Sequence, residues 1–333
     1  MTVDLSKEPA APATAPSDLV FDVRNVTLRF GGVTSLNDVT LQMRRGEILA
    51  IIGPNGAGKT SLFNCLTGVY TPQEGDILLS GRVGEEQSPI VGLRGLIAKK
   101  RRSLKTHVIN HMGVARTYQN IRLFPALTAL ENVKIAIETR QKSGPVSAML
   151  GLPWQRREER ESTERAYDLL QFVGLTRRAN ELAGSLAYGE QRRLEIARAL
   201  GTNPGVILLD EPAAGTNPVE KRELAELIRK INEEDNVSVL LIEHDMKLVM
   251  SVAHRIVVLN FGGKIAEGSP DQIQKDPVVI AAYLGTTTEE AAEVIAEGPL
   301  VEEIDLSTPV LDDTSIEELI DETAENPQDG DLA

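Results

Sequence analysis

The chain has 333 residues, of which 41% are hydrophobic, and a formal net charge of −14. Its single cysteine excludes an internal disulfide framework, and no apolar run reaches the roughly eighteen residues that a membrane-spanning helix needs. Residues 1–17 contain no apolar stretch like that of a signal peptide, which predicts a cytoplasmic protein.

The acidic charge is concentrated at the C-terminus. Residues 286–333 hold 16 of the 49 acidic residues and none of the 35 basic ones, so residues 1–285 carry a balance of +2. We therefore expect a disordered Ala/Pro-rich lead over 1–17, a globular domain over 18–285 and a disordered acidic tail over 286–333. The nearly neutral domain gives no support for nucleic-acid binding.

Two segments near the start of the domain, 19–30 and 39–43, alternate apolar and polar residues. Such alternation is typical of half-buried strands, and we expect the two to pair antiparallel. The apolar run 48–52 that follows has the pattern of a buried strand, and residues 61–66 have the pattern of a helix. Cys65 on that helix is expected to be a small buried hydrophobe.

Between this strand and helix lies Gly-Pro-Asn-Gly-Ala-Gly-Lys-Thr at 53–60, here called the phosphate loop. The order of strand, glycine-rich loop and helix is that of a P-loop. Glycines let backbone N–H groups surround phosphate oxygens at a helix N-terminus. We expect Lys59 to reach the β- and γ-phosphates and the Thr60 hydroxyl to hold Mg²⁺. The sequence therefore predicts binding of a nucleoside triphosphate.

Residues 94–105 include the basic run Lys99-Lys100-Arg101-Arg102. A solvated surface loop is the simpler interpretation, and contact with anionic lipid headgroups or an acidic partner segment is the alternative. A nucleic-acid patch is disfavoured because no aromatic residues are interleaved with the charges.

The second half of the domain alternates helical and strand patterns. Residues 156–172 have apolar positions at helical spacing among many charges. The runs 206–209 and 237–242 are nearly all apolar, as in central parallel strands covered on both faces. Between them, 219–232 has the pattern of an amphipathic helix that begins after Pro218. This order predicts an α/β fold with a parallel sheet.

Polar residues follow both of these strands. Asp210 and Glu211 end the first, where Asp210 suits positioning of Mg²⁺ and Glu211 suits polarising a water that attacks the γ-phosphate. His244 ends the second, and we expect it to share the carboxyl edge of the sheet with Glu211 and to contact the γ-phosphate. The sequence assigns no role to His107, His111 or His254.

The order of these motifs resembles that of ATP-binding-cassette (ABC) ATPases over residues 19–285. Besides the phosphate loop and the acidic strand end, the resemblance rests on Arg116-Thr117-Tyr118-Gln119, Leu186-Ala187-Tyr188-Gly189-Glu190-Gln191-Arg192-Arg193, Ala214-Gly215-Thr216-Asn217 and His244. It implies an α/β P-loop NTPase fold of the ABC type, with a parallel-sheet core, an antiparallel β subdomain and a helical subdomain at about 120–200.

The resemblance also implies roles for individual residues. Phe30, 23 residues before Gly53, would stack on adenine, and the alternative is a strand residue that fills the core. Gln119 would sense Mg²⁺ and the γ-phosphate and link the site to membrane subunits. Asn217 stands where the family usually has an aspartate. The expected ATP contacts are Phe30, Gly53, Pro54, Asn55, Gly56, Ala57, Gly58, Lys59, Thr60, Ser61, Leu186, Ala187, Tyr188, Gly189 and Glu190, with Thr60, Gln119 and Asp210 around Mg²⁺ and with Glu211, His244 and Gln119 as catalytic residues.

In such ATPases two copies pair head to tail, and Leu186–Glu190, here called the signature run, completes the phosphate site of the partner. The family's usual sequence is Leu-Ser-Gly-Gly-Gln, and here Ala187 replaces the serine, Tyr188 the first glycine and Glu190 the glutamine. The serine hydroxyl normally donates to the γ-phosphate across the dimer, so its absence removes one hydrogen bond, worth about 0.5–1.5 kcal/mol. We expect weaker ATP-driven dimerisation without loss of activity.

Four segments narrow the resemblance to the ATPases of branched-chain amino acid importers: 186–198, 120–125, 241–250 and 283–285. Residues 84–103 and the tail after Gly285 are additions relative to that subgroup. The resemblance implies a peripheral protein at the cytoplasmic face of the plasma membrane. Its implied partners are a second ABC ATPase (identical or different), two permease subunits and, indirectly, an extracytoplasmic substrate-binding protein, with no nucleic acid.

Two alternatives remain open from the sequence. One is the same motor with another cargo, either a urea or amide importer or a lipid exporter. The other is a soluble ABC ATPase in translation or DNA repair, which is disfavoured because those proteins usually carry two cassettes or a long coiled-coil insertion.

Overall fold

The computed structural model describes residues 18–81, 87–92, 102–139 and 153–285. The expectations for the lead 1–17, the tail 286–333 and the basic residues Lys99–Arg101 lie outside the described residues. In the described ranges, no helix combines the length and the apolar character that crossing a membrane requires.

One sheet of the molecule is antiparallel, with the strand order β2-β1-β4-β5-β6. Its first two strands, β1 (Leu19–Phe30) and β2 (Val33–Arg44), pair antiparallel, which confirms the predicted pairing; β2 begins before the predicted 39–43 because a tight turn joins it directly to β1. The other strands are β4 (Glu74–Leu79), β5 (Ser88–Gly92) and β6 (Arg102–Ser103). The described part of the stretch 84–103, which we expect to be an addition, therefore extends this sheet at its edge.

The second sheet has the order β11-β10-β3-β9-β8-β7 and forms the core. The strands β3 (Ile48–Ile52), β8 (Val206–Asp210) and β9 (Ser238–Ile242) are buried at every position, as their apolar runs predict. They pair parallel with each other and with β7 (Val114–Arg116) and β10 (Arg255–Asn260). Only β11 (Gly263–Gly268) is antiparallel to its neighbour. The predicted α/β class and parallel-sheet core are confirmed.

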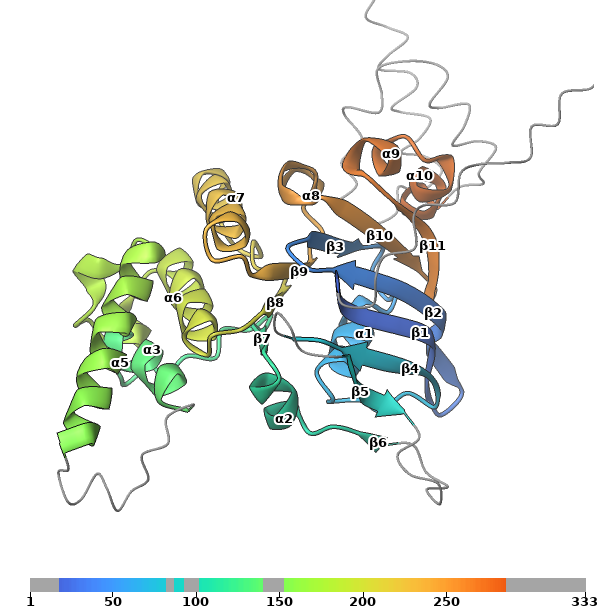
Figure 1. Ribbon diagram of the computed structural model, residues 1–333. Coiled ribbons are helices and arrows are strands. Elements are labelled where there is room, and N and C mark those ends of the chain that lie inside the picture. Colours follow the sequence, from blue (N-terminus) through green and yellow to red (C-terminus); the bar gives the residue numbers. More distant parts are fainter. Residues whose placement is uncertain (1–17, 82–86, 93–101, 140–152, 286–333) are drawn as a thin grey trace, which may run out of the picture.

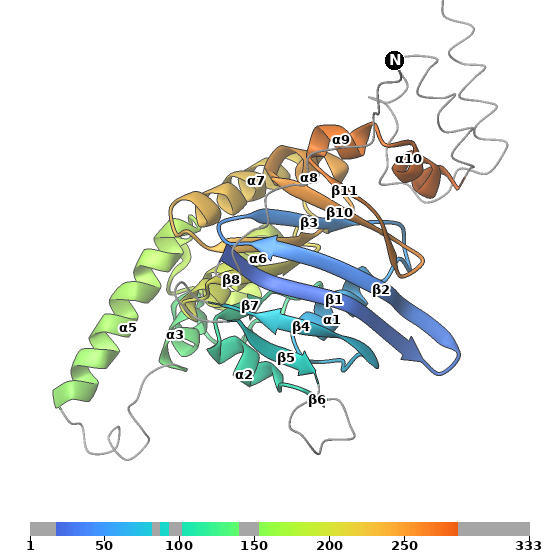
Figure 2. The same cartoon turned by 45° about the vertical axis from the view of Figure 1, so that its right-hand side comes forward.

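Alternate residues of the central strand β3 enter two different hydrophobic cores. Ile48, Ala50 and Ile52 pack with the apolar faces of α7 (Pro218–Glu233) and α8 (Met246–Val252). Leu49 and Ile51 pack with α1 (Lys59–Leu66) and the antiparallel sheet. The parallel sheet is therefore the middle layer of the domain (Figures 1 and 2). Cys65 on α1 is fully buried, as predicted, and burial raises the pKa of its thiol to about 12.

Further short helices are α2 (Thr106–His111), before β7, and α9 (Pro270–Gln274) and α10 (Pro277–Leu284), after β11. The last described residue, Gly285, ends α10 in the left-handed conformation (φ 73°).

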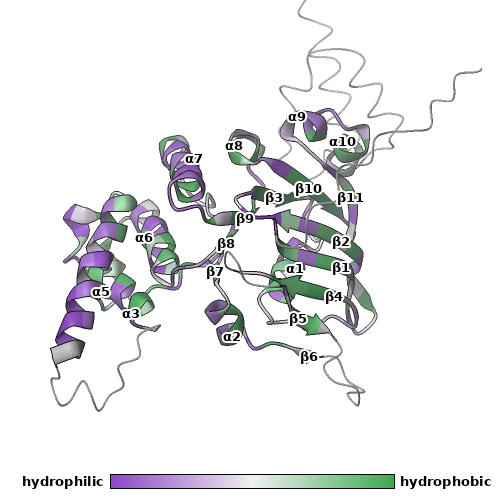
Figure 3. Cartoon of the chain, in the orientation of Figure 1, coloured by the Kyte–Doolittle hydropathy of each residue, from purple (hydrophilic) through white to green (hydrophobic). Residues whose placement is uncertain are grey.

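A group of helices extends away from the sheets on one side (Figure 1). It consists of α3 (Ala129–Glu138), α5 (Pro153–Phe172) and α6 (Tyr188–Gly201), with 3₁₀ turns at Thr176–Arg178 and Ala183–Ser185. This group occupies about the stretch that the family resemblance assigns to a helical subdomain. In Figure 3 α5 is largely hydrophilic, in agreement with its dense charges. The predicted helix 156–172 is confirmed, with a start three residues earlier.

Candidate nucleotide and metal site

The phosphate loop connects the carboxyl end of β3 to the start of α1 and requires glycine at two close approaches. A Cβ on Gly53 (φ 147°) would lie 2.0 Å from the carbonyl oxygen of Leu259, and one on Gly58 (φ 100°) would lie 2.6 Å from that of Ser35. Both distances are impossible for a real side chain, so the backbone of the loop lies against its neighbours at these points. Gly58 also precedes α1, which directs the helix N-terminus toward the loop.

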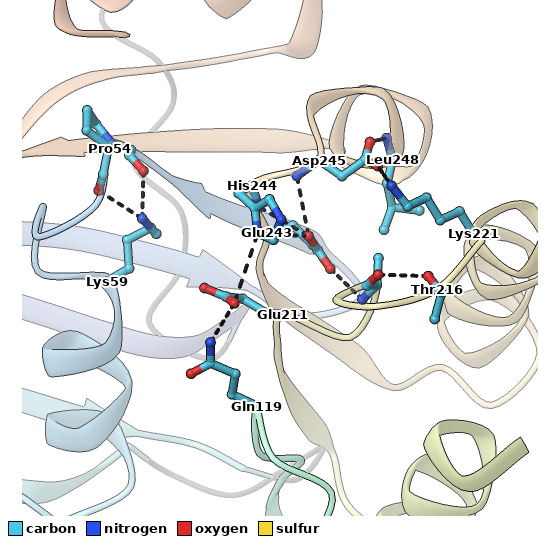
Figure 4. Close-up of polar contacts among 12 residues, drawn as sticks. Pro54, Lys59, Gln119, Glu211, Thr216, Lys221, Glu243, His244, Asp245 and Leu248 are labelled. Atoms are coloured by element: carbon cyan, nitrogen blue, oxygen red, sulfur yellow. Dashed lines mark hydrogen bonds and ion pairs between the residues drawn. The ribbon is translucent and has the colours of Figure 1, made fainter. Parts of the chain in front are cut away.

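Lys59 is held inside the phosphate loop. Its side chain is buried, and its ammonium donates to the carbonyl oxygens of Gly53 at 2.6 Å and of Pro54 at 3.0 Å (Figure 4). Burial lowers the pKa of Lys59, and the charges of Glu211 and Asp210 oppose this shift. A desolvated cation with neutral partners attracts an incoming anion strongly, which suits a phosphate group.

The structure brings Gln119, Glu211 and His244 together at the carboxyl edge of the parallel sheet. The Gln119 amide Nε2 donates to Glu211 Oε2 at 2.8 Å, and His244 Nδ1 lies 4.0 Å from the same oxygen (Figure 4). These residues follow β7, β8 and β9, which are neighbours in the sheet. The expectation that His244 shares this edge with Glu211 is confirmed.

The backbone of Glu211 is unusual. Its φ is 47°, in the left-handed region that is uncommon for residues with a side chain, and its N–H donates to the carbonyl of Ile242 at 2.9 Å. Glu211 is therefore held at the end of β8, and 22% of its side chain is exposed. A water molecule can therefore reach it.

Asp210 makes a contact that the sequence did not predict. Its side chain is buried and its Oδ2 accepts from Arg116 Nη2 at 2.7 Å. Arg116 also donates to Asn64 and Thr67 on and just after α1. Arg116 belongs to the motif Arg-Thr-Tyr-Gln at 116–119, but the motif alone does not reveal this partner.

The proposed metal ligands offer oxygen atoms, the kind that Mg²⁺ prefers. The Thr60 side chain is exposed, and the Gln119 amide uses its nitrogen for Glu211, so its oxygen is available. The ion pair of Asp210 with Arg116 uses Oδ2. No cluster of three His, Cys, Asp or Glu side chains that could hold a metal occurs among the described residues, so phosphate oxygens would have to complete the coordination.

Glu243 is a second residue that sequence reasoning missed. It is fully buried, and its carboxylate accepts the backbone N–H of Ala213 at 2.6 Å, of His244 at 3.1 Å and of Asp245 at 3.4 Å. Burial raises the pKa of Glu243, although these N–H groups and the charge of His244 act in the opposite direction. The carboxylate joins the loop after Glu211 to the loop that carries His244.

The signature run lies at the N-terminus of α6, among the helices on the far side of the sheet from α1 (Figure 1). There Ala187 is the residue before the helix, and its N–H donates to Glu190 Oε2 at 3.1 Å, while Glu190 Oε1 pairs with Arg178. A Cβ on Gly189 would meet the side chain of Glu220 at 2.6 Å, so this corner packs on the start of α7. The structure thus gathers the phosphate loop, Gln119, Asp210, Glu211 and His244, and the signature run lies beside this group at the N-terminus of α6.

Phe30 ends β1 with 46% of its surface exposed, and its ring meets that of Tyr70 edge-on at 5.0 Å. The alternative interpretation of Phe30 as a core residue is therefore wrong. An exposed ring face of this kind is available for stacking.

Comparisons with known proteins agree in sequence and in fold. The ABC transporter family matches residues 36–214, and a family described as branched-chain amino acid ATP-binding cassette transporter matches residues 264–288. The chain is 48% identical to the high-affinity branched-chain amino acid transport ATP-binding protein BraF of Pseudomonas aeruginosa, over 80% of this chain and 98% of that protein. It is 46% identical to the corresponding protein LivG of Escherichia coli, over 81% and 99%.

Solved structures of similar fold include two ATP-binding cassettes. MJ1267 in its ADP conformation matches with a TM-score of 0.66 and 29% identity, over 80% of this chain and 99% of that chain. The dimeric post-hydrolysis state of MJ0796 bound to ADP and Pi matches with a TM-score of 0.58 and 26% identity, over 75% and 98%.

Proposed function

Because this chain belongs to the ABC transporter family and is an ATPase of that family, we propose that it hydrolyses ATP to drive the uptake of branched-chain amino acids. The cargo assignment is supported by the match of residues 264–288 and by relatives that are 46–48% identical over nearly their whole length. The observation that carries the hydrolytic function is the convergence of Gln119 and His244 on the carboxylate of Glu211.

In the proposed site, backbone N–H groups of residues 55–61 surround the phosphates, and Lys59 moves from the loop carbonyls to the β- and γ-phosphates. A bound Mg²⁺, held by Thr60, Asp210 and Gln119, would neutralise charge on the transferred phosphoryl group. Glu211 accepts a proton from the attacking water, a contribution of about 10²–10⁴ in rate for general bases of this type. His244 contacts the γ-phosphate, and Phe30 stacks on adenine.

The complete site requires two cassettes. In the proposed dimer, identical or with a different ABC ATPase, the signature run of one chain contacts the nucleotide bound by the other. The position of α6 apart from α1, and the dimer formed by MJ0796, support this arrangement. At the cytoplasmic face of the membrane the dimer would act on two permease subunits, which receive cargo from an extracytoplasmic binding protein.

Glu211→Gln tests the hydrolytic role. We expect ATP binding within about threefold of wild type and hydrolysis reduced by about 10²–10⁴-fold, because the amide cannot take the proton from water. Binding is measured with a fluorescent ATP analogue and hydrolysis by phosphate release. Glu226→Gln, on the exposed face of α7, is the control. Normal turnover in Glu211→Gln would show that this residue is not the base.

The cargo is tested in vesicles that contain the chain with its permease partners and, outside, the binding protein. We expect ATP-dependent uptake of leucine, isoleucine and valine, lost in Glu211→Gln. Uptake of urea or amides without uptake of these amino acids would assign the motor to another importer.

A further inference from the structure

A buried charged pair on α6 lies between the signature run and Gln119. Arg192 and Glu195 are each 1% exposed, and Arg192 Nη1 donates to Glu195 Oε2 at 3.2 Å. Burial raises the pKa of Glu195, although the charge of Arg192 acts to lower it. Removing these charged groups from water therefore costs free energy. Since an apolar pair often stabilises a fold as well as a buried ion pair does, stability alone does not explain these residues.

The pair binds the backbone around Gln119 from both sides. Arg192 donates to the carbonyl oxygen of Tyr118 at 2.7 Å through Nη1 and to that of Gln119 at 2.8 Å through Nη2. Glu195 Oε1 accepts the N–H of Arg122 at 3.3 Å and of Tyr118 at 3.5 Å. Carbonyl and N–H groups of residues 118–122 are therefore fixed to α6, although this segment follows β7 of the sheet.

The same guanidinium also reaches the signature run. Arg192 Nη2 donates to the Tyr188 hydroxyl at 3.0 Å. A Cβ on Gly215 would lie 3.4 Å from the Tyr188 ring, so the ring packs beside the loop that precedes α7. Arg192 thus connects Tyr188, one turn away on α6, with the backbone of Gln119.

We propose that Arg192 is a positioning residue that fixes the Gln119 amide at Glu211 and makes its placement depend on the signature run. The Arg192 guanidinium fixes the backbone carbonyl of Gln119. The side-chain amide of the same Gln119 donates to Glu211 at 2.8 Å. When the signature run of one chain contacts the nucleotide bound by its partner, Arg192 would transmit this contact to Gln119. Gln119 would then be positioned in the nucleotide site of the first chain. This inference rests on the proposed function.

Arg192→Lys tests the proposal in the full-length ATPase. Lysine keeps the charge, but its single nitrogen cannot serve both carbonyls and the Tyr188 hydroxyl in the fork geometry of arginine. We expect kcat to fall at least about tenfold while the KM for ATP stays within about threefold. In a Gln119→Ala background the same substitution should change kcat by no more than about twofold, because residues that act in one path are not additive.

Arg229→Lys is the matched control, since Arg229 donates to a backbone carbonyl, that of Ser251, outside the site. If Arg192→Lys does not fold, as judged by thermal unfolding, Glu195→Gln replaces it in the same cycle. An equal loss of kcat with and without Gln119, or no loss in either, would overturn the proposal. Absence of ATPase activity in the wild-type protein would instead contradict the proposed function.

Discussion

Glu243 shows how one buried carboxylate organises two loops beside the nucleotide site. It accepts three backbone N–H groups, from Ala213, His244 and Asp245, so the loops after β8 and β9 share one acceptor. Full burial nevertheless disfavours its charge and raises its pKa. The site therefore contains a carboxylate that is costly to ionise and a lysine, Lys59, that is costly to protonate.

Glu243→Gln removes this titrating carboxyl group. Because its pKa is raised in the folded state, folding takes up a proton between the pKa of an unfolded glutamate and the folded value, so wild-type stability falls as pH rises through this window. Glutamine does not titrate. We expect the free energy of unfolding of wild type minus that of Glu243→Gln to decrease as pH rises above about 4.3.

Urea unfolding at a series of pH values measures this difference, with Glu226→Gln as the exposed control. A difference that stays constant or increases with pH would contradict the assigned shift. The variant should also lose ATPase activity, since glutamine presents an N–H group to one of the backbone donors.

Lys59→Ala removes the charged donor of the phosphate loop. We expect the affinity for ATP to fall at least about tenfold, because removal of a desolvated cation leaves the γ-phosphate without its charged donor. Equilibrium binding of a fluorescent ATP analogue measures this. Lys264→Ala, at an exposed position of β11, should bind normally, and unchanged affinity in Lys59→Ala would argue against the phosphate loop.

At the scale of elements, the N-termini of α6 and α7 differ in their caps. Asn217 accepts the N–H groups of Val219 and Glu220 at 2.9 and 3.0 Å and caps α7. Ala187 precedes α6 in the same extended conformation, but its side chain cannot accept, so only Glu190 contributes to the cap. The departure from the family's serine therefore weakens the helix start as well as the proposed contact across the dimer.

We expect Ala187→Ser to raise the free energy of unfolding by about 0.5–2 kcal/mol, since its hydroxyl can accept an orphan N–H group of α6. ATP-induced dimerisation should be equal or tighter, because the hydroxyl hydrogen remains available to the γ-phosphate. Thermal unfolding and sedimentation measure the two effects. Asn217→Ala removes the cap of α7 and should lower the free energy of unfolding by a similar amount. Weaker ATP-induced dimerisation in Ala187→Ser would show that the lost serine hydroxyl does not weaken pairing.

Along the chain, the net negative charge and the proposed site residues lie in different segments. All 16 acidic residues of 286–333 lie at 289 or beyond, whereas the family matches end at 288 and every proposed site residue precedes 245. The near-neutral domain and the strongly acidic tail are therefore separable in sequence.

Deletion of 289–333 should change the net charge from −14 to +2 and leave kcat within about twofold, because the deleted residues include no proposed ligand of ATP. Anion-exchange retention and phosphate release measure the two effects. The control combines this deletion with Glu211→Gln, and its ATPase activity should stay as low as that of Glu211→Gln alone. A large change of kcat would show that the tail regulates the motor.

Much of this protein was determined by its sequence alone, because the relevant signals are local. The strand, glycine loop and helix of 48–66, the buried strands predicted at 206–209 and 237–242 and the helix predicted at 219–232 are each specified within one short segment. The structure has all of them, with bounds that differ by one residue for both strands and for the helix after Pro218. The shared carboxyl edge followed as well, because parallel strands end on the same side of a sheet.

Only the tertiary structure decided which side chains meet. Arg116 pairs with Asp210 across 94 residues, Arg192 holds Gln119 across 73, and Glu243 reaches Ala213 across 30. Strand order, loop direction and burial set such contacts, and none of these is a property of a local pattern. The fold also sets the position of the signature run, which lies apart from α1 because α6 packs where its apolar face is covered.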